Sequence, residues 1–234
     1  MNLFFAKDIE EGYLLLDEAE SRHCIRVLRM KQGDEALATD GRGNLYTCAI
    51  IGADAHACRM KILATKKVKE NSGFRLHIAI APPKNAERFD WFLEKSTEIG
   101  IQEITPVICE HSERKKMNPE RGKKILLAAM KQSQKAFLPL LHPQVSFREF
   151  VKMNLPGDRY IAYCETGREH ALASAYRKGT DAVILIGPEG DFSPEEIKAA
   201  QDSGWITVNL GPGRLRTETA GVVACHTVNL INNL

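Results

Sequence analysis

From residue 74 onward, short apolar runs alternate with segments of helical periodicity, and this alternation constrains the fold more than any other feature of the sequence. The predicted strands cover residues 76–81, 104–108, 160–164, 182–186 and 207–210. Predicted helices follow them: one capped by Asn85 and ending before Gly100, one opening at Asn118-Pro119, and others at 169–177, 194–203 and 220–232. Strands and helices that alternate at this spacing form βαβ units, so we predict an α/β domain with a parallel sheet.

The first 70 residues have a different pattern. Short apolar runs at 3–6, 13–16, 36–39, 45–51 and 60–65 are separated by turns, and the sequence DGRGN at 40–44 is typical of a β-hairpin loop. Only the segment 21–30 has helical spacing. We therefore predict a small β-barrel with one short helix, a polar linker at 66–73, and two domains at 1–70 and 74–234.

The composition of the 234 residues is that of a globular protein, with 44% hydrophobic and 26% charged residues, and excludes a disordered or fibrous chain. No stretch approaches the roughly 18 apolar residues of a membrane span, and the N-terminus lacks the features of a secretory signal. The six cysteines contain no Cys-x-x-Cys pair, so we expect reduced thiols, a cytoplasmic protein and no membrane partner. The seven histidines show no pairing at metal-ligand spacing, so we expect no metal.

Positive charge is concentrated in the middle of the chain. Residues 73–153 carry 14 Lys and Arg against 9 Asp and Glu, and eight of these basic residues lie within 111–135. A solvated helix face explains most charge runs of this kind. A cluster of one sign in a nearly neutral protein also favours a polyanionic partner, and charge alone leaves the two interpretations open.

Three predicted strand ends are followed by unusual loops: YCETG at 163–167, IGPEGDFSPEE at 186–196 and LGPGRLRTETA at 210–220. Glycine and proline after a strand usually mark only a turn. Two glycine-rich loops at consecutive strand ends of one parallel sheet favour a nucleoside-like ligand, because ligands gather at the carboxyl ends of such strands. The middle loop ends in SPEE, which predicts a capping box with Pro194 at the first helical position.

The chemistry of these loops narrows the ligand further. Neither the dinucleotide fingerprint nor the phosphate-binding P-loop motif is present in the sequence. The loops carry the carboxylates of Glu165, Glu189, Asp191 and Glu218, which would repel phosphate groups. Their charge suits a cationic cofactor, such as a sulfonium.

The runs LIGPEGDFSPEEI (185–197) and NLGPGRLRTETA (209–220) resemble the C-terminal motifs of the RsmE-type 16S ribosomal RNA methyltransferases, of the SPOUT class. The resemblance extends over nearly the whole chain, with H-x-x-x-V-L-R-x-x-x-G-D from His23 to Asp34 and K-x-T-E-I-G from Lys95 to Gly100. The family often has Gly where Asp191 stands and Arg-Ile where Gly213 and Arg214 stand.

This resemblance implies a fold and an activity. The fold would be an N-terminal PUA-like β-barrel followed by a SPOUT-type parallel-sheet domain with a C-terminal trefoil knot. The activity would be transfer of a methyl group from S-adenosyl-L-methionine to N3 of a specific uridine in 16S ribosomal RNA of the small ribosomal subunit. Such enzymes are usually homodimers.

The resemblance also implies site residues. The cofactor would be held by Glu165, Thr166, Ile186, Gly187, Pro188, Glu189, Gly190, Leu210, Gly211, Leu215, Arg216, Thr217, Thr219 and Ala220. RNA contacts are expected from Arg26, Arg29 and Lys31 in the barrel and from Lys84, Lys95, Arg114, Lys115 and Lys116 in the sheet domain.

Arg216 and Glu218 are the expected catalytic residues. The fixed donors of the Arg216 guanidinium suit the oxygens of a uracil anion, and an ion pair between Arg216 and Glu218 is the alternative. The proton acceptor is open between Glu165, Glu189, Glu218 and water. We expect Thr217 to cap the last helix.

Two other functions remain open at this point. One is a related SPOUT enzyme with another RNA target, such as a ribose hydroxyl in transfer RNA. The other is a non-catalytic RNA-binding factor in ribosome assembly.

Overall fold

The computed structural model describes residues 2–69, 73–163 and 171–234, and the chain divides into two compact units. The first unit comprises Met1–Glu70 and Met130–Leu138, and the second comprises Asn71–Ala129 and Pro139–Leu234. None of the helices in these described ranges is long and apolar enough to cross a bilayer.

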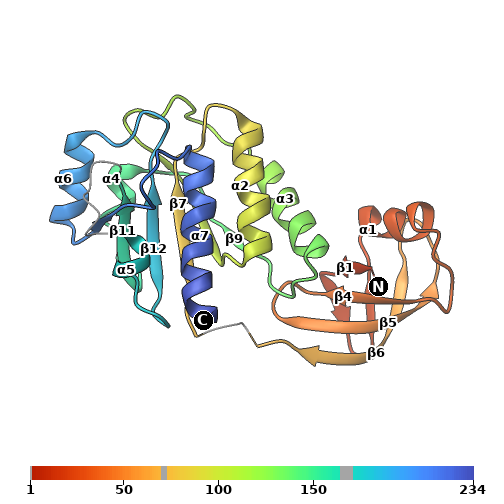
Figure 1. Ribbon diagram of the computed structural model, residues 1–234. Coiled ribbons are helices and arrows are strands. Elements are labelled where there is room, and N and C mark those ends of the chain that lie inside the picture. Colours follow the sequence, from red (N-terminus) through yellow and green to blue (C-terminus); the bar gives the residue numbers. More distant parts are fainter. Residues whose placement is uncertain (1, 70–72, 164–170) are drawn as a thin grey trace. The chain divides into compact units, whose positions relative to one another are not determined.

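The first unit is built on a six-stranded sheet (Figure 1). Its order is β1 (Leu3–Phe5), β4 (Glu35–Thr39), β5 (Asn44–Gly52), β6 (Arg59–Lys67), β3 (Tyr13–Leu15) and β2 (Asp8–Glu10). The β1–β4 pair is parallel and the other pairs are antiparallel. The two edge strands β1 and β2 are only two residues apart in the chain, so the sheet must curl until its edges approach. The predicted barrel-like fold is confirmed.

Two short helical turns cover this sheet: α1 (Glu18–Arg22) and the π-helix η1 (His23–Val27). The helix predicted at 21–30 therefore begins and ends about three residues earlier, and it changes from an α-helix to a π-helix at His23. Cys24 of η1 is completely buried against the sheet, while Val27 is 65% exposed.

A segment distant in sequence completes the first unit. The Thr39 hydroxyl donates to the carbonyl of Ala136, the amide of Gly43 donates to the same carbonyl, and Lys131 forms an ion pair with the buried Glu20. These contacts hold residues 130–138 in the first unit, although the sequence analysis placed them within the domain 74–234. Sequence periodicity reports only on neighbouring residues, so it could not show that residues 130–138 pack with the first unit.

The second unit is a seven-stranded sheet in which every pair is parallel. Its order is β10 (Val145–Ser146), β8 (Glu103–Ile108), β7 (Leu76–Ile80), β12 (Ala182–Ile186), β11 (Asp158–Ala162) and β13 (Ile206–Val208), with β9 (Leu140–Leu141) also on β8. The predicted strands were right in kind and place, and the two-residue strands β9 and β10 were too short to be predicted.

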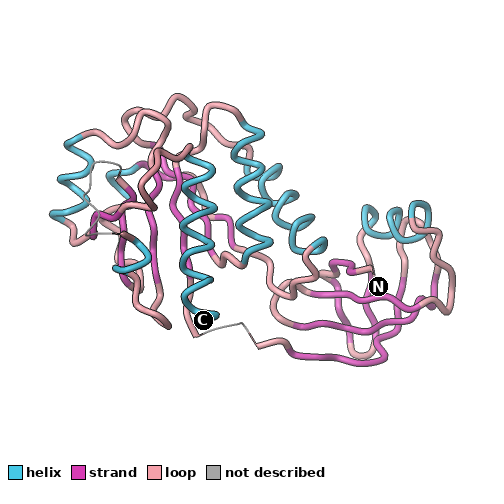
Figure 2. Tube along the Cα trace, viewed as in Figure 1, coloured by secondary structure: helices cyan, strands magenta, loops and turns pink. Residues whose placement is uncertain are grey.

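Helices pack on both faces of this sheet, as the cyan helices and magenta strands of Figure 2 show. One face is covered by α2 (Ala86–Ile99) and α7 (Thr217–Asn233), which pack against each other. Gly221 allows their close approach, since a Cβ there would lie 2.6 Å from the Phe92 ring. The other face is covered by α4 (Phe147–Phe150) and α6 (Pro194–Asp202), around a core that includes Phe192 and Trp205.

The remaining helices are α3 (Pro119–Gln132) and α5 (Leu172–Ala175). Four predicted helix ends are confirmed: Asn85 caps α2, Gly100 ends it, Asn118 accepts from the first amides of α3, and Ser193 and Glu196 form a capping box with Pro194. The predicted helix at 169–177 is reduced to α5 in its described part.

Candidate functional site

The parallel strands of the second unit all end at one edge, where the loops after β12 and β13 lie (Figure 1). Most of the third expected loop, 163–167, lies outside the described residues. The loop after β12 and the start of α7 are directly joined, because the Thr217 hydroxyl donates to the carbonyl of Gly187 at 3.0 Å. Thr217 is buried, so this hydrogen bond is shielded from water. The fold therefore brings the two glycine-rich segments together, as the sequence predicted.

Neighbouring loops hold the segment after β12 in place. Glu189 accepts a hydrogen bond from the amide of Lys84 at 3.0 Å through Oε1, and Lys84 follows β7. The Nδ1 atom of His111, which follows β8, lies 3.2 Å from the carbonyl oxygen of Gly190 and 3.0 Å from that of Asp191. A Cβ on Gly190 would lie 3.1 Å from that of His111, so a larger residue at this position would have to push His111 slightly away.

Asp191 stands where the family it resembles often has glycine, and its backbone conformation shows why either residue fits. Its φ is +61°, the left-handed region that glycine adopts most easily and Asp tolerates better than most residues. Its own Oδ1 accepts from the amide of Phe192 at 2.8 Å, which helps to fix the turn. The tight turn is thus kept without glycine.

The loop after β13 is much more open. Gly211, Gly213, Arg214 and Arg216 are exposed, and Leu215 is half-buried. Among the described residues, the Arg216 side chain forms no ion pair. Arg216 is also the N-cap residue of α7, without a side-chain cap. The expectation that Thr217 caps this helix is therefore wrong, because Thr217 is its first residue and its hydroxyl bonds to Gly187 instead.

Glu218 is the most unusual group at this edge. It is only 6% exposed, and its Oε1 lies 3.7 Å from Nε of Arg88, in the first turn of α2. Its Oε2 is buried and has no hydrogen-bond partner among the described residues. A buried carboxylate oxygen without a donor is costly, so such an atom calls for a ligand that supplies one. Its ionic partner is Arg88, which the sequence analysis did not single out, and not Arg216.

The other expected cofactor residues that the structure describes lie at the same edge. Pro188 is buried and Leu210, Thr219 and Ala220 are half-buried. The Ile186 side chain is 2% exposed, so it packs in the core and leaves its backbone for a ligand. Glu165 and Thr166 lie outside the described residues.

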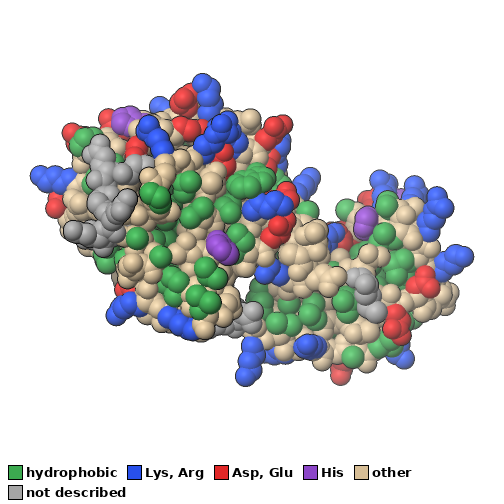
Figure 3. All heavy atoms as spheres, in the orientation of Figure 1, with side chains coloured by type: hydrophobic (Ala, Val, Ile, Leu, Met, Phe, Trp, Pro, Cys, Tyr) green, Lys and Arg blue, Asp and Glu red, His purple; other side chains and the backbone are tan. Residues whose placement is uncertain are grey.

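Several of the expected RNA-binding residues of the second unit lie near this edge as well. Lys84 forms an ion pair with Glu113 at 2.6 Å, and the hydrogen bond to Glu113 raises the pKa of Lys84. Lys115 and Lys116 are exposed. Lys95 is apart from them in the second half of α2, where Glu94 and Glu98 neutralise it. Figure 3 shows Lys and Arg side chains over the upper end of this unit, where Figure 1 places the strand ends.

In the first unit, the expected RNA-binding residues Arg26, Arg29 and Lys31 are all exposed on η1 and the turn that follows it. Arg29 has a φ of +54°, a left-handed backbone conformation that is uncommon for a residue other than glycine.

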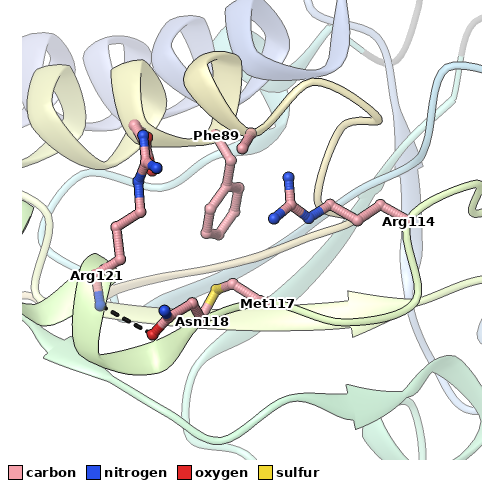
Figure 4. A pocket seen from close by; sticks show the side chains of 8 residues that line it. Phe89, Arg114, Met117, Asn118 and Arg121 are labelled. Atoms are coloured by element: carbon pink, nitrogen blue, oxygen red, sulfur yellow. Dashed lines mark hydrogen bonds and ion pairs between the residues drawn. The ribbon is translucent and has the colours of Figure 1, made fainter.

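A small pocket lies between α2 and the start of α3 (Figure 4). Phe89 forms one wall, and the Arg114 guanidinium points toward it from the facing loop. Arg121 is neutralised there by Asp90. The pocket holds about 20 Å³, far below the roughly 300–1,000 Å³ usual for ligand sites, and none of the expected cofactor residues lines it. We therefore do not assign the cofactor to it.

At the opposite, amino-terminal edge of the sheet, the fold brings together three residues that sequence spacing did not pair. His77 of β7, Glu103 of β8 and His142 after β9 place one potential ligand atom each within 4.8 Å of one another. Burial lowers the pKa of His77 to about 4. No metal was expected because the histidines show no pairing at metal-ligand spacing: 26 and 39 residues separate these side chains, and only strand pairing brings them together.

Comparison with known protein families identifies both units. The family model described as an RNA methyltransferase domain matches residues 69–229, and the model described as an RNA methyltransferase PUA domain matches residues 16–63.

Individual relatives agree over nearly the whole chain. A ribosomal RNA small subunit methyltransferase E of Buchnera aphidicola is 31% identical, over 93% of this chain and 87% of its own. A structure from Porphyromonas gingivalis, described as a probable rRNA-methyltransferase, is 40% identical with a TM-score of 0.91 over 100% of this chain and 99% of the other.

The ribosomal RNA small subunit methyltransferase E of Neisseria gonorrhoeae, solved bound to S-adenosyl methionine, is 26% identical with a TM-score of 0.85 over 96% and 95% of the two chains. With two matching family models and relatives similar over both units, this chain belongs to the family of ribosomal RNA small subunit methyltransferases E.

Proposed function

We propose that this chain transfers the methyl group of S-adenosyl-L-methionine to N3 of a uridine in 16S ribosomal RNA. The observation that carries the proposal is the strand-end edge of the second unit. There the two glycine-rich segments meet through the Thr217–Gly187 hydrogen bond, beside the unpartnered Oε2 of Glu218.

The residues present fit this cofactor. The buried Oε2 of Glu218 is an acceptor that awaits a donor, and the N3–H group of the uracil supplies one beside the bound cofactor. The carboxylates of Glu189 and Asp191 at the same edge suit its positive charge. When bound, the cofactor supplies an electrophilic methyl group on a sulfonium.

Arg216 is the residue we propose to act on the uracil. The N3 of uracil becomes a good nucleophile only after it loses its proton, which leaves negative charge on the flanking oxygens. Arg216 is exposed at the start of α7 and has no competing ion pair in the described part of the chain. Its guanidinium can therefore donate two hydrogen bonds to those oxygens as the charge develops.

Glu218 is the proton acceptor we favour among the alternatives. Glu189 already accepts from the Lys84 amide through Oε1, whereas Oε2 of Glu218 accepts no hydrogen bond from a described residue. Arg88 lies beside Oε1 and holds the carboxylate in position. Substitution Glu218→Gln should remove the base but keep the shape, so turnover should fall while S-adenosylmethionine still binds.

The RNA partner follows from the exposed basic residues of both units. We propose that Arg26, Arg29 and Lys31 in the first unit and the Arg114–Lys116 stretch in the second contact the RNA of the small ribosomal subunit. Each phosphate that a basic residue neutralises releases counterions and so makes binding salt-dependent. With this substrate, the reaction takes place in the cytoplasm.

Two further features belong to the proposal. The chain leaves β13 at the sheet edge beside β11 and then packs α7 against β7 and β12. This return across the strand ends supports a C-terminal trefoil knot of the SPOUT type. Hydrophobic side chains lie over α7 in Figure 3, and Leu230 of α7 is 46% exposed, which supports a homodimer through this helix.

The decisive experiment is to incubate the protein with labelled S-adenosylmethionine and small ribosomal subunits that lack the modification, and then to map the labelled nucleoside. We expect one methyl group per subunit, on N3 of a uridine. A labelled methyl group on a ribose, or in transfer RNA, would show that the enzyme has another target than N3 of a uridine in 16S ribosomal RNA. If the cofactor neither raised the unfolding temperature nor reacted, the protein would instead be a non-catalytic assembly factor.

The RNA contact is tested by replacing Arg114, Lys115 and Lys116 together with glutamine. We expect the slope of log affinity against log salt to become shallower by about 2 units. The control replaces Lys66, Lys67 and Lys69, which are exposed and carry the same total charge, whereas Arg114 is half-buried. Equal slopes in the two triple variants would remove the Arg114–Lys116 stretch from the RNA interface.

A further inference from the structure

The amino-terminal edge of the parallel sheet carries a second cluster of reactive side chains, at the other end of β7 from the cofactor loops. His77 and Glu103 are register partners on β7 and β8, and His142 directly follows β9 on the other side of β8. The three therefore come from neighbouring strands whose positions the sheet fixes. Nε2 of His142 lies 2.7 Å from Oε2 of Glu103, and the two histidine rings are 5.1 Å apart.

We propose that His77, Glu103 and His142 form a binding site for a divalent transition-metal ion of the zinc type. Two imidazoles and one carboxylate are a ligand set that zinc takes in proteins, commonly with water as the fourth ligand. The potential ligand atoms all lie within 4.8 Å of one another, so small side-chain rotations bring them around one ion. Hard cations such as Mg²⁺ prefer oxygen ligands only, which the two histidines disfavour.

The surroundings resemble the supporting shell of a metal site. The Thr105 hydroxyl lies 2.7 Å from Nε2 of His77 and fixes the orientation of this ring. The Phe150 ring stands edge-on to His77 at 5.6 Å and provides an apolar wall. His77 is 8% exposed, whereas the His142 side chain is 32% exposed and leaves an entry path.

Arg75 allows a metal site to be distinguished from a network of ion pairs. Its Nη2 lies 3.1 Å from Oε1 of Glu103, so this positive charge competes with a metal ion for the carboxylate. A cluster that served only as an ion-pair network would be weakened by the loss of Arg75. A metal site would instead bind its ion as well or better without it.

The role of such an ion would be structural. It would join β7, β8 and the segment after β9 at the edge away from the reacting groups. Methyl transfer should therefore continue after the protein is stripped with a chelator, which separates a failure of this proposal from a failure of the proposed function.

Isothermal titration of the chelator-treated, untagged full-length protein with Zn²⁺ tests the site. We expect one ion per chain, and at a free Zn²⁺ concentration about 100 times Kd we expect the unfolding temperature to rise by about 5 °C or more. Co²⁺ in its place should give the visible absorption bands of a nitrogen- and oxygen-ligated ion of low coordination number.

Three variants decide the outcome. His142→Gln, at a half-exposed position, should weaken Zn²⁺ binding by about 100-fold and remove the Co²⁺ bands. His56→Gln is the matched control, because His56 also lies beside a carboxylate, Glu18 at 3.2 Å, but no described residue offers it a third ligand. Arg75→Gln should bind Zn²⁺ at least as tightly as the unchanged protein. Equal binding by the His142 and His56 variants, or no binding by the unchanged protein, would overturn the proposal.

Discussion

The two glycine-rich loops at the strand ends are similar in sequence but differ in how the fold holds them. The loop after β12 is fixed by the Lys84 amide, by His111 and by the Ser193–Glu196 capping box. The loop after β13 is exposed from Gly211 to Arg214, and the amide of Gly211 bonds only within the loop, to Asn209 at 3.2 Å.

This difference indicates two tasks at one site. A loop that is held before any ligand arrives loses little entropy on binding, which suits recognition of the cofactor. A loop with an exposed arginine can adjust to the second reactant. Substitutions in the two loops and at their junction test this division.

Arg216→Ala should give the largest effect, because it removes the donors proposed to stabilise the uracil anion. We expect kcat to fall by about 10²–10³-fold with the affinity for S-adenosylmethionine changed by less than about threefold. Arg214→Ala in the same exposed loop is the control and should keep most of the activity. If the Arg214 variant were the inactive one, Arg214 and not Arg216 would be the residue that stabilises the uracil anion.

Thr217→Val should affect the junction of the two loops. The substitution removes the donor to the Gly187 carbonyl in a buried setting, which costs about 1–2 kcal/mol. We expect the Kd for S-adenosylmethionine to rise about tenfold while kcat at saturation stays nearly constant. Thr227→Val, further along α7, should change neither quantity. A fall in kcat alone would place Thr217 with the reacting groups rather than with the cofactor.

Ser193→Ala should loosen the fixed loop by removing the capping box of α6. A lost N-cap costs about 1 kcal/mol, or about 2–4 °C in unfolding temperature for a chain of this size. Ser146→Ala removes the same type of box from α4, which follows β10 and contains none of the expected cofactor residues. Calorimetry should show similar losses in both variants, but only Ser193→Ala should also weaken cofactor binding, by about threefold. Equal cofactor affinities would mean that this cap does not serve the site.

Asp191→Gly should have the smallest effect. Glycine suits the φ of +61° and removes the Asp191–Phe192 hydrogen bond, so the two changes nearly cancel within about 0.5 kcal/mol. Asp191→Val, with a branched side chain at the same φ, should lower the free energy of unfolding by about 1–2 kcal/mol. Denaturant unfolding measures both. A large loss from glycine would show that the carboxylate, and not the turn, is what this position needs.

The local features of the fold were predictable because they depend on neighbours in sequence. The continuous apolar runs of β7 and β12 predicted strands buried on both faces, and each of their residues is buried. The same holds for the apolar stripe of α2, where Phe89, Phe92 and Leu93 are buried as expected. Trp91 stands at helical spacing beside Phe89 and Phe92, which predicts that it packs in the core, but it is 41% exposed, because it lies on the opposite side of the helix.

The site was predictable only in part. Glycine, proline and carboxylate residues after two strands indicated where the loops lie and which charge they carry. The partner of Glu218 was not predictable, because Arg88 is 130 residues away and reaches it only through the packing of α2 on α7. The hydroxyl of Thr217 was assigned to its own helix for the same reason: local rules do not include a carbonyl on another loop.

The sequence by itself determined the strands, helices and turns, since hydrophobic period, caps and glycine positions act over a few residues. The tertiary structure decided which distant groups meet: Glu218 with Arg88, Thr217 with Gly187, residues 130–138 with the first unit, and His77 with Glu103 and His142. The physical reason is that the order of strands in a sheet is set by packing of the whole chain, and no local pattern encodes it.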